Sequence, residues 1–197
     1  MEQTLHRSGQ ASKTTIDRSI RAENKAMLLR RWKIAKSAVH EDVKTVNRWF
    51  AGQRAMLEIL SVLDESKVLY IADCGTPLFS VQVPRNFELL DFPDFTSRDA
   101  FEKDGQTEVF MALATRLDAL RSTCAQACML YNITPFDAKH LMRHGPHELL
   151  TMSTDPVTQI LPAVSDAYFL ATAQRIMSDA EKTVFASVSR RQKTVVC

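Results

Sequence analysis

Apolar residues recur at helical spacing over most of the chain. After Ala22, four of them form a stripe at i, i+4, i+7 and i+11: Leu28, Trp32, Ala35 and Val39. The same period predicts three further long helices, over residues 41–63, 107–131 and 163–187, and a short one over 155–162. Gly52 interrupts the first of these at some cost in stability. The pattern therefore predicts a mainly α fold, built as a helical bundle.

Alternating apolar and polar residues replace the helical period at one place. Residues 67–72 and 78–83 have the pattern of strands, and the Gly-containing loop between them predicts one small β-hairpin over about 67–83. The second strand also resembles the DNA-reading strand of ribbon-helix-helix proteins. In that alternative, the outward Ser80 and Gln82, followed by Arg85, would face the major groove. The partner strand in the same chain favours a structural hairpin instead.

Helix-start and helix-stop signals cluster between Asn132 and Met152. Thr134 is expected to be an N-cap, with Pro135 at the first helical position. Gly145 is expected to end this helix in a left-handed conformation, and Pro146 to open a second helix. Two short helices joined by a glycine turn are typical of a helix-turn-helix-like unit, predicted here over about 134–153.

The apolar residues of this unit are expected to face the core and its basic residues to face outward. The core side comprises Ala138, Leu141, Met142, Leu149 and Met152. The outward side comprises Lys139, His140, Arg143, His144 and His147. A cationic surface of this kind can contact DNA phosphates, although any helical corner in a bundle needs the same turn.

Charge is unevenly distributed along the chain. Residues 1–54 hold 12 Lys and Arg against 5 Asp and Glu, residues 55–183 hold 10 against 18, and the remainder adds three basic residues. Basic ends suggest contact with a polyanion, and three side chains of the first long helix are candidates for it: Arg30, Arg31 and Lys33. Residues 1–21 lack an apolar period and predict a mobile basic arm. Residues 22–188 would then form the helical domain, and 189–197 a basic tail.

Other chemistry finds little support. The spacing Cys124-x3-Cys128-x11-His140-x3-His144 is close to that of a zinc finger, but both cysteines fall on the buried stripe of a helical pattern. No metal or cofactor is therefore predicted. The sequence has no phosphate-binding glycine loop, no His-Glu-x-x-His and no Gly-x-Ser-x-Gly, which argues against an enzyme. Without a long apolar run or a signal region, we expect a cytoplasmic protein with no membrane contact.

The stretch from about Val109 to Asp166 resembles the FlhD subunit of the bacterial flagellar master regulator. A long helix rich in Leu and Ala is followed by the turn Tyr131-Asn132-Ile133, a short helix with Asp137-Ala138 and Leu141, and a second start at Gly145-Pro146. The resemblance implies an oligomeric transcriptional activator subunit that acts with a second regulator protein at bacterial promoters. Related pairs control conjugative transfer of mobile elements.

Taken together, the sequence predicts a DNA-binding transcriptional regulator of a bacterial or mobile-element operon. The alternative is a helical adaptor or chaperone that binds proteins and not DNA. That alternative accounts for the acidic middle of the chain without any DNA contact.

Overall fold

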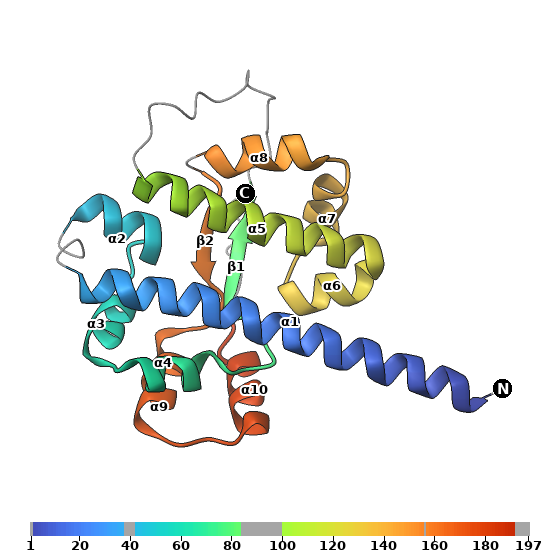
Figure 1. Ribbon diagram of the computed structural model, residues 1–197, viewed down its shortest axis with the longest axis horizontal. Helices are drawn as coiled ribbons and strands as arrows, with labels where there is room; N and C mark the ends of the chain where they lie inside the picture. Colours follow the sequence, from blue (N-terminus) through green and yellow to red (C-terminus); the bar gives the residue numbers. More distant parts are fainter. Residues whose placement is uncertain (1, 38–41, 84–99, 156, 192–197) are drawn as a thin grey trace. The chain divides into compact units, whose positions relative to one another are not determined.

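The structure is a computed structural model that describes residues 2–37, 42–83, 100–155 and 157–191 (Figure 1). These residues form ten helices and one two-stranded antiparallel sheet, which confirms the predicted mainly α class. They divide into two compact units. No helix in the described ranges is long and apolar enough to cross a membrane.

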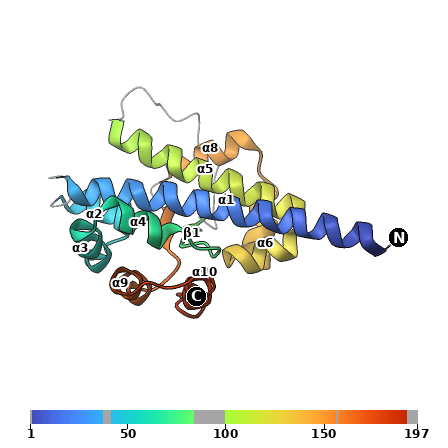
Figure 2. The same cartoon turned by 60° about the horizontal axis from the view of Figure 1, so that its bottom comes forward.

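The first unit is built on the long helix α1. Its elements are α1 (Glu2–Lys36), α3 (Arg54–Val62), α4 (Glu65–Ala72), α9 (Asp166–Gln174) and α10 (Asp179–Val188). Helices α3 and α4 pack against α1, and α9 packs against both of them. Figure 2 shows α9 and α10 nearly end-on and side by side. Buried Leu28, Leu60 and Phe169 belong to the core of this unit.

The second unit is built on α5. It contains α5 (Ala100–Ser122), α6 (Cys124–Tyr131), α7 (Pro135–Leu141), α8 (Pro146–Thr154) and most of the two strands, β1 (Phe79–Gln82) and β2 (Gln159–Pro162). Helices α6 and α8 pack against α5, and α7 packs against α6. The remaining helix, α2 (Val43–Phe50), begins in the first unit and ends in the second.

The predicted pairing of the hairpin is wrong. Residues 67–72 lie in α4, and β1 pairs with β2, a segment predicted as a short helix. Asp64 explains the helix, because its side chain caps α4 by accepting a hydrogen bond from the Lys67 N–H at 2.7 Å. Val68 and Ile71 then share one buried face at i and i+3.

Three of the long predicted helices are each divided into two in the structure, and a fourth begins earlier than predicted. The helix predicted over 41–63 divides at Gly52, the one over 107–131 at Thr123, and the one over 163–187 at residues 175–178. The helix predicted from Ala22 begins at Glu2, so the supposed mobile arm is helical from there on. In the predicted tail, Arg190 forms a bridge with Val164 and Arg191 bonds to Gln53 and Asp166.

The element order is the same twice along the chain. A first repeat, α1–α2–α3–α4–β1, is followed by a second, α5–α6–α7–α8–β2. Helices α2, α3 and α4 begin at residues 43, 54 and 65, and α6, α7 and α8 begin at 124, 135 and 146, a constant offset of 81 residues.

The offset also matches individual residues. Positions paired by it are buried in both repeats: Val46 and Ala127, Phe50 and Tyr131, Leu57 and Ala138, Leu60 and Leu141, Val68 and Leu149, Ile71 and Met152. Among the described residues, the two non-glycine residues with positive φ are Ala51 (50°) and Asn132 (52°), which are also one offset apart. The two repeats therefore share one framework of buried positions and turns.

Each of the long helices α1 and α5 also contains a buried arginine with similar contacts. Arg31 in α1 and Arg116 in α5 are both buried, at 1% and 2% exposure. Each donates from Nη1 to the carbonyl four residues earlier, at 3.0 Å. Each guanidinium also lies over an aromatic ring, Phe79 at 4.5 Å or Tyr131 at 4.7 Å.

Candidate nucleic-acid interface

The start of α7 is formed as the sequence predicts. The Thr134 hydroxyl accepts a hydrogen bond from the Asp137 N–H at 3.1 Å, and Pro135 occupies the first helical position. Ala138 and Leu141 are buried on the inner side. The helical turn continues past Leu141, because the Arg143 N–H donates to the His140 carbonyl at 3.1 Å.

The start of α8 is confirmed at Pro146, but Gly145 acts differently from the prediction. Its backbone is extended, with φ −91° and ψ 175°, so it is the N-cap of α8 and not a left-handed stop. The Glu148 carboxylate accepts a hydrogen bond from the Gly145 N–H at 2.5 Å and lies 3.3 Å from His144 Nδ1. The hydrogen bond from Gly145 is the larger cause and the contact with His144 the smaller. Together they hold the pKa of Glu148 below its usual range.

Three of the five predicted basic residues project into solvent. Lys139, Arg143 and His147 are all exposed. Exposed Phe136 shares their side of the helix, because 136, 139 and 143 are spaced at i, i+3 and i+7. We call Phe136, Lys139, Arg143 and His147 the outer stripe.

The other two histidines do not face outward, which corrects the prediction. The His144 side chain is 14% exposed and is held by Glu148. Its ring contacts the His140 ring edge-to-face, with centroids 4.8 Å apart. The cause is the tight turn after α7, where the His144 N–H bonds to the Leu141 carbonyl and Arg121 donates to the His144 carbonyl at 3.2 Å. His140, near the end of α7, and His144, in the turn after it, thus pack against each other and do not belong to the outer surface.

The candidates on α1 are divided in the same way. Lys33 is exposed and Arg30 is half-buried, whereas Arg31 is buried within the first unit. The prediction that Arg31 contacts phosphates is wrong, because its buried guanidinium donates to the Met27 carbonyl and lies over the Phe79 ring. The amphipathic period could not separate these three neighbours, since it does not show which residues stack on an aromatic ring.

The strand candidates give little support to the ribbon alternative. The Ser80 hydroxyl donates to the Leu161 carbonyl in the neighbouring strand, at 3.4 Å, while Gln82 is exposed. The partner of β1 is a strand of the same chain. Arg85 lies outside the described residues.

The cysteines do not lie on the buried stripe as predicted. Cys124 is exposed and Cys128 is half-buried, on the first turns of α6. Burial raises the pKa of the Cys128 thiol, and the neighbouring Cys124 raises it further. Within the described ranges, no three His, Cys, Asp or Glu side chains come together as a metal site.

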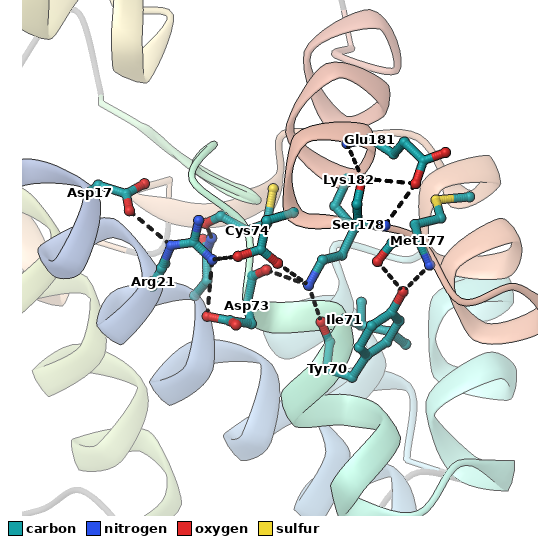
Figure 3. Close-up of polar contacts among 12 residues, drawn as sticks. Asp17, Arg21, Tyr70, Ile71, Asp73, Cys74, Met177, Ser178, Glu181 and Lys182 are labelled. Carbon is teal, nitrogen blue, oxygen red and sulfur yellow. Dashed lines mark hydrogen bonds and ion pairs between the residues drawn. The ribbon is translucent and has the colours of Figure 1, made fainter. Parts of the chain in front are cut away.

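A second charged cluster lies in the first unit and has a structural role. The buried Lys182 ammonium donates to the carbonyls of Tyr70 at 3.1 Å and Asp73 at 2.6 Å, at the end of α4 (Figure 3). It also pairs with Asp179 at 3.2 Å. The lysine therefore joins α10 to the C-terminal end of α4, where carbonyls lack helical partners.

Arginine 21 extends this cluster along α1. Arg21 pairs with Asp17 at 2.9 Å, Asp73 at 3.1 Å and Asp179 at 3.3 Å. Burial opposes ionisation of Asp73, but Arg21 and Lys25 together hold its pKa below the usual range. Cations and carboxylates are matched here, so the cluster offers no surplus charge to a ligand.

The outer stripe differs in charge from the corresponding surface of the first repeat. At the 81-residue offset, Ala55, Glu58, Val62 and Ser66 stand in place of Phe136, Lys139, Arg143 and His147. All four first-repeat residues are also exposed. The framework therefore does not require basic residues at these positions. Periodicity alone could not reveal this comparison between the repeats, because the residues paired by the 81-residue offset are rarely identical.

A scan of protein-family models finds none that matches this chain, and searches of curated proteins and of solved structures find no match either. The resemblance to the FlhD family stays a prediction.

Proposed function

We propose that this protein is a DNA-binding regulator that contacts duplex DNA through the outer stripe. The supporting observation is the comparison between repeats. Shared positions are buried and maintain the fold, whereas Lys139 and Arg143 are exposed where the first repeat has Glu58 and Val62. Side chains that folding does not require, and that share one charge, are suited to binding a polyanion.

The carboxylates of α7 and α8 are less exposed than these cations. Asp137 and Glu148 are the acidic residues of α7 and α8, and both are half-buried at the third helical position. Glu148 is engaged with Gly145 and His144. The exposed ionisable side chains of these two helices and their turn are Lys139, Arg143 and His147.

Each residue type of the stripe has a distinct role in this proposal. Lys139 and Arg143 pair with phosphates and provide salt-dependent affinity. Phe136, 67% exposed on the first turn of α7, offers an apolar contact such as the thymine methyl group accepts.

The resemblance of residues 109–166 to the FlhD family supports the same proposal. It points to transcriptional regulation, as an activator, of a bacterial or mobile-element operon. A second regulator subunit and a homo-oligomer are the partners that it implies.

The test is the affinity for a fluorescein-labelled mixed-sequence duplex, measured by anisotropy at fixed salt. We expect the variant K139A/R143A to bind about tenfold more weakly or worse, since two phosphate contacts are lost. The matched control is K44A/R175A, which removes the same charge from two exposed residues of the first unit. Equal affinity of both variants and the wild type would refute the proposal.

Binding of a protein partner is the second candidate function. Met129 on α6 is 79% exposed, and Phe136 on the first turn of α7, after the Asn132 turn, is 67% exposed. Exposed large apolar residues near each other are typical of protein-binding surfaces. In this case M129A/F136A would lose the partner while K139A/R143A would keep it, and duplex DNA would not be retained at physiological salt.

A further inference from the structure

We infer that the two repeats have divided their roles. The second presents the DNA-binding face, whereas the first carries no basic residue at the four corresponding positions and uses other residues of α3 and α4 to hold the C-terminal helices. This inference rests on the proposed function for its DNA arm. The shared framework of buried positions and left-handed turns makes the two faces comparable residue by residue.

Helices α3 and α4 of the first repeat are engaged within the chain, through residues other than the exposed counterparts of the outer stripe. The Tyr70 hydroxyl bonds to both the carbonyl and the N–H of Met177, between α9 and α10 (Figure 3). The buried Tyr168 hydroxyl of α9 donates to the Ile71 carbonyl at 3.1 Å. The side-chain oxygen of Gln53, the N-cap of α3, accepts a hydrogen bond from Arg191 at 2.9 Å. Helices α3 and α4 are therefore bonded to the C-terminal segment at three points.

The corresponding residues of the second repeat make local contacts instead. Thr151 stands where the first repeat has Tyr70, and its hydroxyl donates to the His147 carbonyl of the same helix at 3.2 Å. Thr134 stands in place of Gln53 and caps its own helix. No element following β2 in the described residues is needed to satisfy these groups.

The charges point in the same direction. Helices α3 and α4 with their turn expose Glu58, Asp64 and Glu65 against one exposed cation, Arg54. A polyanion is repelled by such a surface and attracted by the outer stripe. Of the two corresponding surfaces, we therefore expect the one on the second repeat to bind DNA.

Exchanging residues between the repeats tests the division of roles. K139E/R143V gives the second repeat the residues of the first. We expect this variant to lose mixed-sequence duplex binding, by more than about tenfold in anisotropy, with an unchanged thermal midpoint. Y70T gives the first repeat the residue of the second. It should lower the midpoint by several degrees, about 4 °C or more, and leave duplex affinity unchanged.

Two further variants keep the test decisive. Y70F removes only the hydroxyl contacts to Met177 and replaces Y70T if that variant does not fold. R54A removes the exposed cation of α3, α4 and their turn and should bind DNA like the wild type.

The outcomes are distinguishable. If R54A weakens duplex binding as much as R143A does, or if Y70F reduces DNA affinity at full stability, the division of roles is wrong. If the wild type itself does not bind the duplex, the proposed function fails, while the stability measurements on Y70T and Y70F still test whether α4 holds the C-terminal helices.

Discussion

The turns that follow α2 and α6 place Ala51 and Asn132 in the left-handed region, at φ 50° and 52°. This conformation brings Cβ close to the following carbonyl, which costs an ordinary residue about 1–2 kcal/mol, whereas asparagine tolerates it better. The alanine persists because the neighbouring Phe50 is fully buried and fixes the chain direction. Local strain in the first repeat is thus tolerated by its packing.

Replacing Ala51 by glycine should relieve this strain. We expect A51G to be more stable than the wild type by about 1 kcal/mol, since glycine has no Cβ to clash. Urea denaturation with an unchanged slope would measure it. The matched substitution N132G should give a smaller gain, and a loss of stability in A51G would show that the turn is not strained.

At the scale of elements, cap chemistry predicts more than periodicity does. Thr134–Pro135 and Pro146 mark the starts of α7 and α8 correctly, because capping depends on residues within one turn. Residues 67–72 have strand-like composition yet form α4, because Asp64 caps the start and Val68 packs inward with Ile71. Tertiary packing overrides local composition here.

The end of α4 also depends on distant residues that no local pattern contains. Lys182 lies 109 residues after Asp73, whose carbonyl it binds. We expect K182M to destabilise the protein by about 2–4 kcal/mol, since it leaves two part-buried carbonyls without the Lys182 donor. Urea unfolding would measure this, with K36M on the exposed part of α1 as the control. A change below that of the control would mean that the cluster does not join α10 to α4.

At the scale of the whole molecule, duplication of one framework is the main finding that sequence patterns missed. Over residues 43–72, the identities at the 81-residue offset are Leu60 with Leu141 and Leu69 with Leu150. The repeats match in burial and backbone conformation and seldom in residue type. Single-sequence periodicity detects each helix but not their correspondence, so it could not separate Lys139 and Arg143 from basic residues with structural roles, such as Arg31.

The central claim is that Lys139 and Arg143 contact phosphates, and the salt dependence of duplex binding tests it most directly. The logarithm of affinity should fall linearly with the logarithm of salt concentration, and K139A/R143A should reduce the slope by about two relative to the wild type. K44A/R175A should keep the wild-type slope. An identical slope for all three proteins would contradict the account, because the outer stripe would then release no counterions.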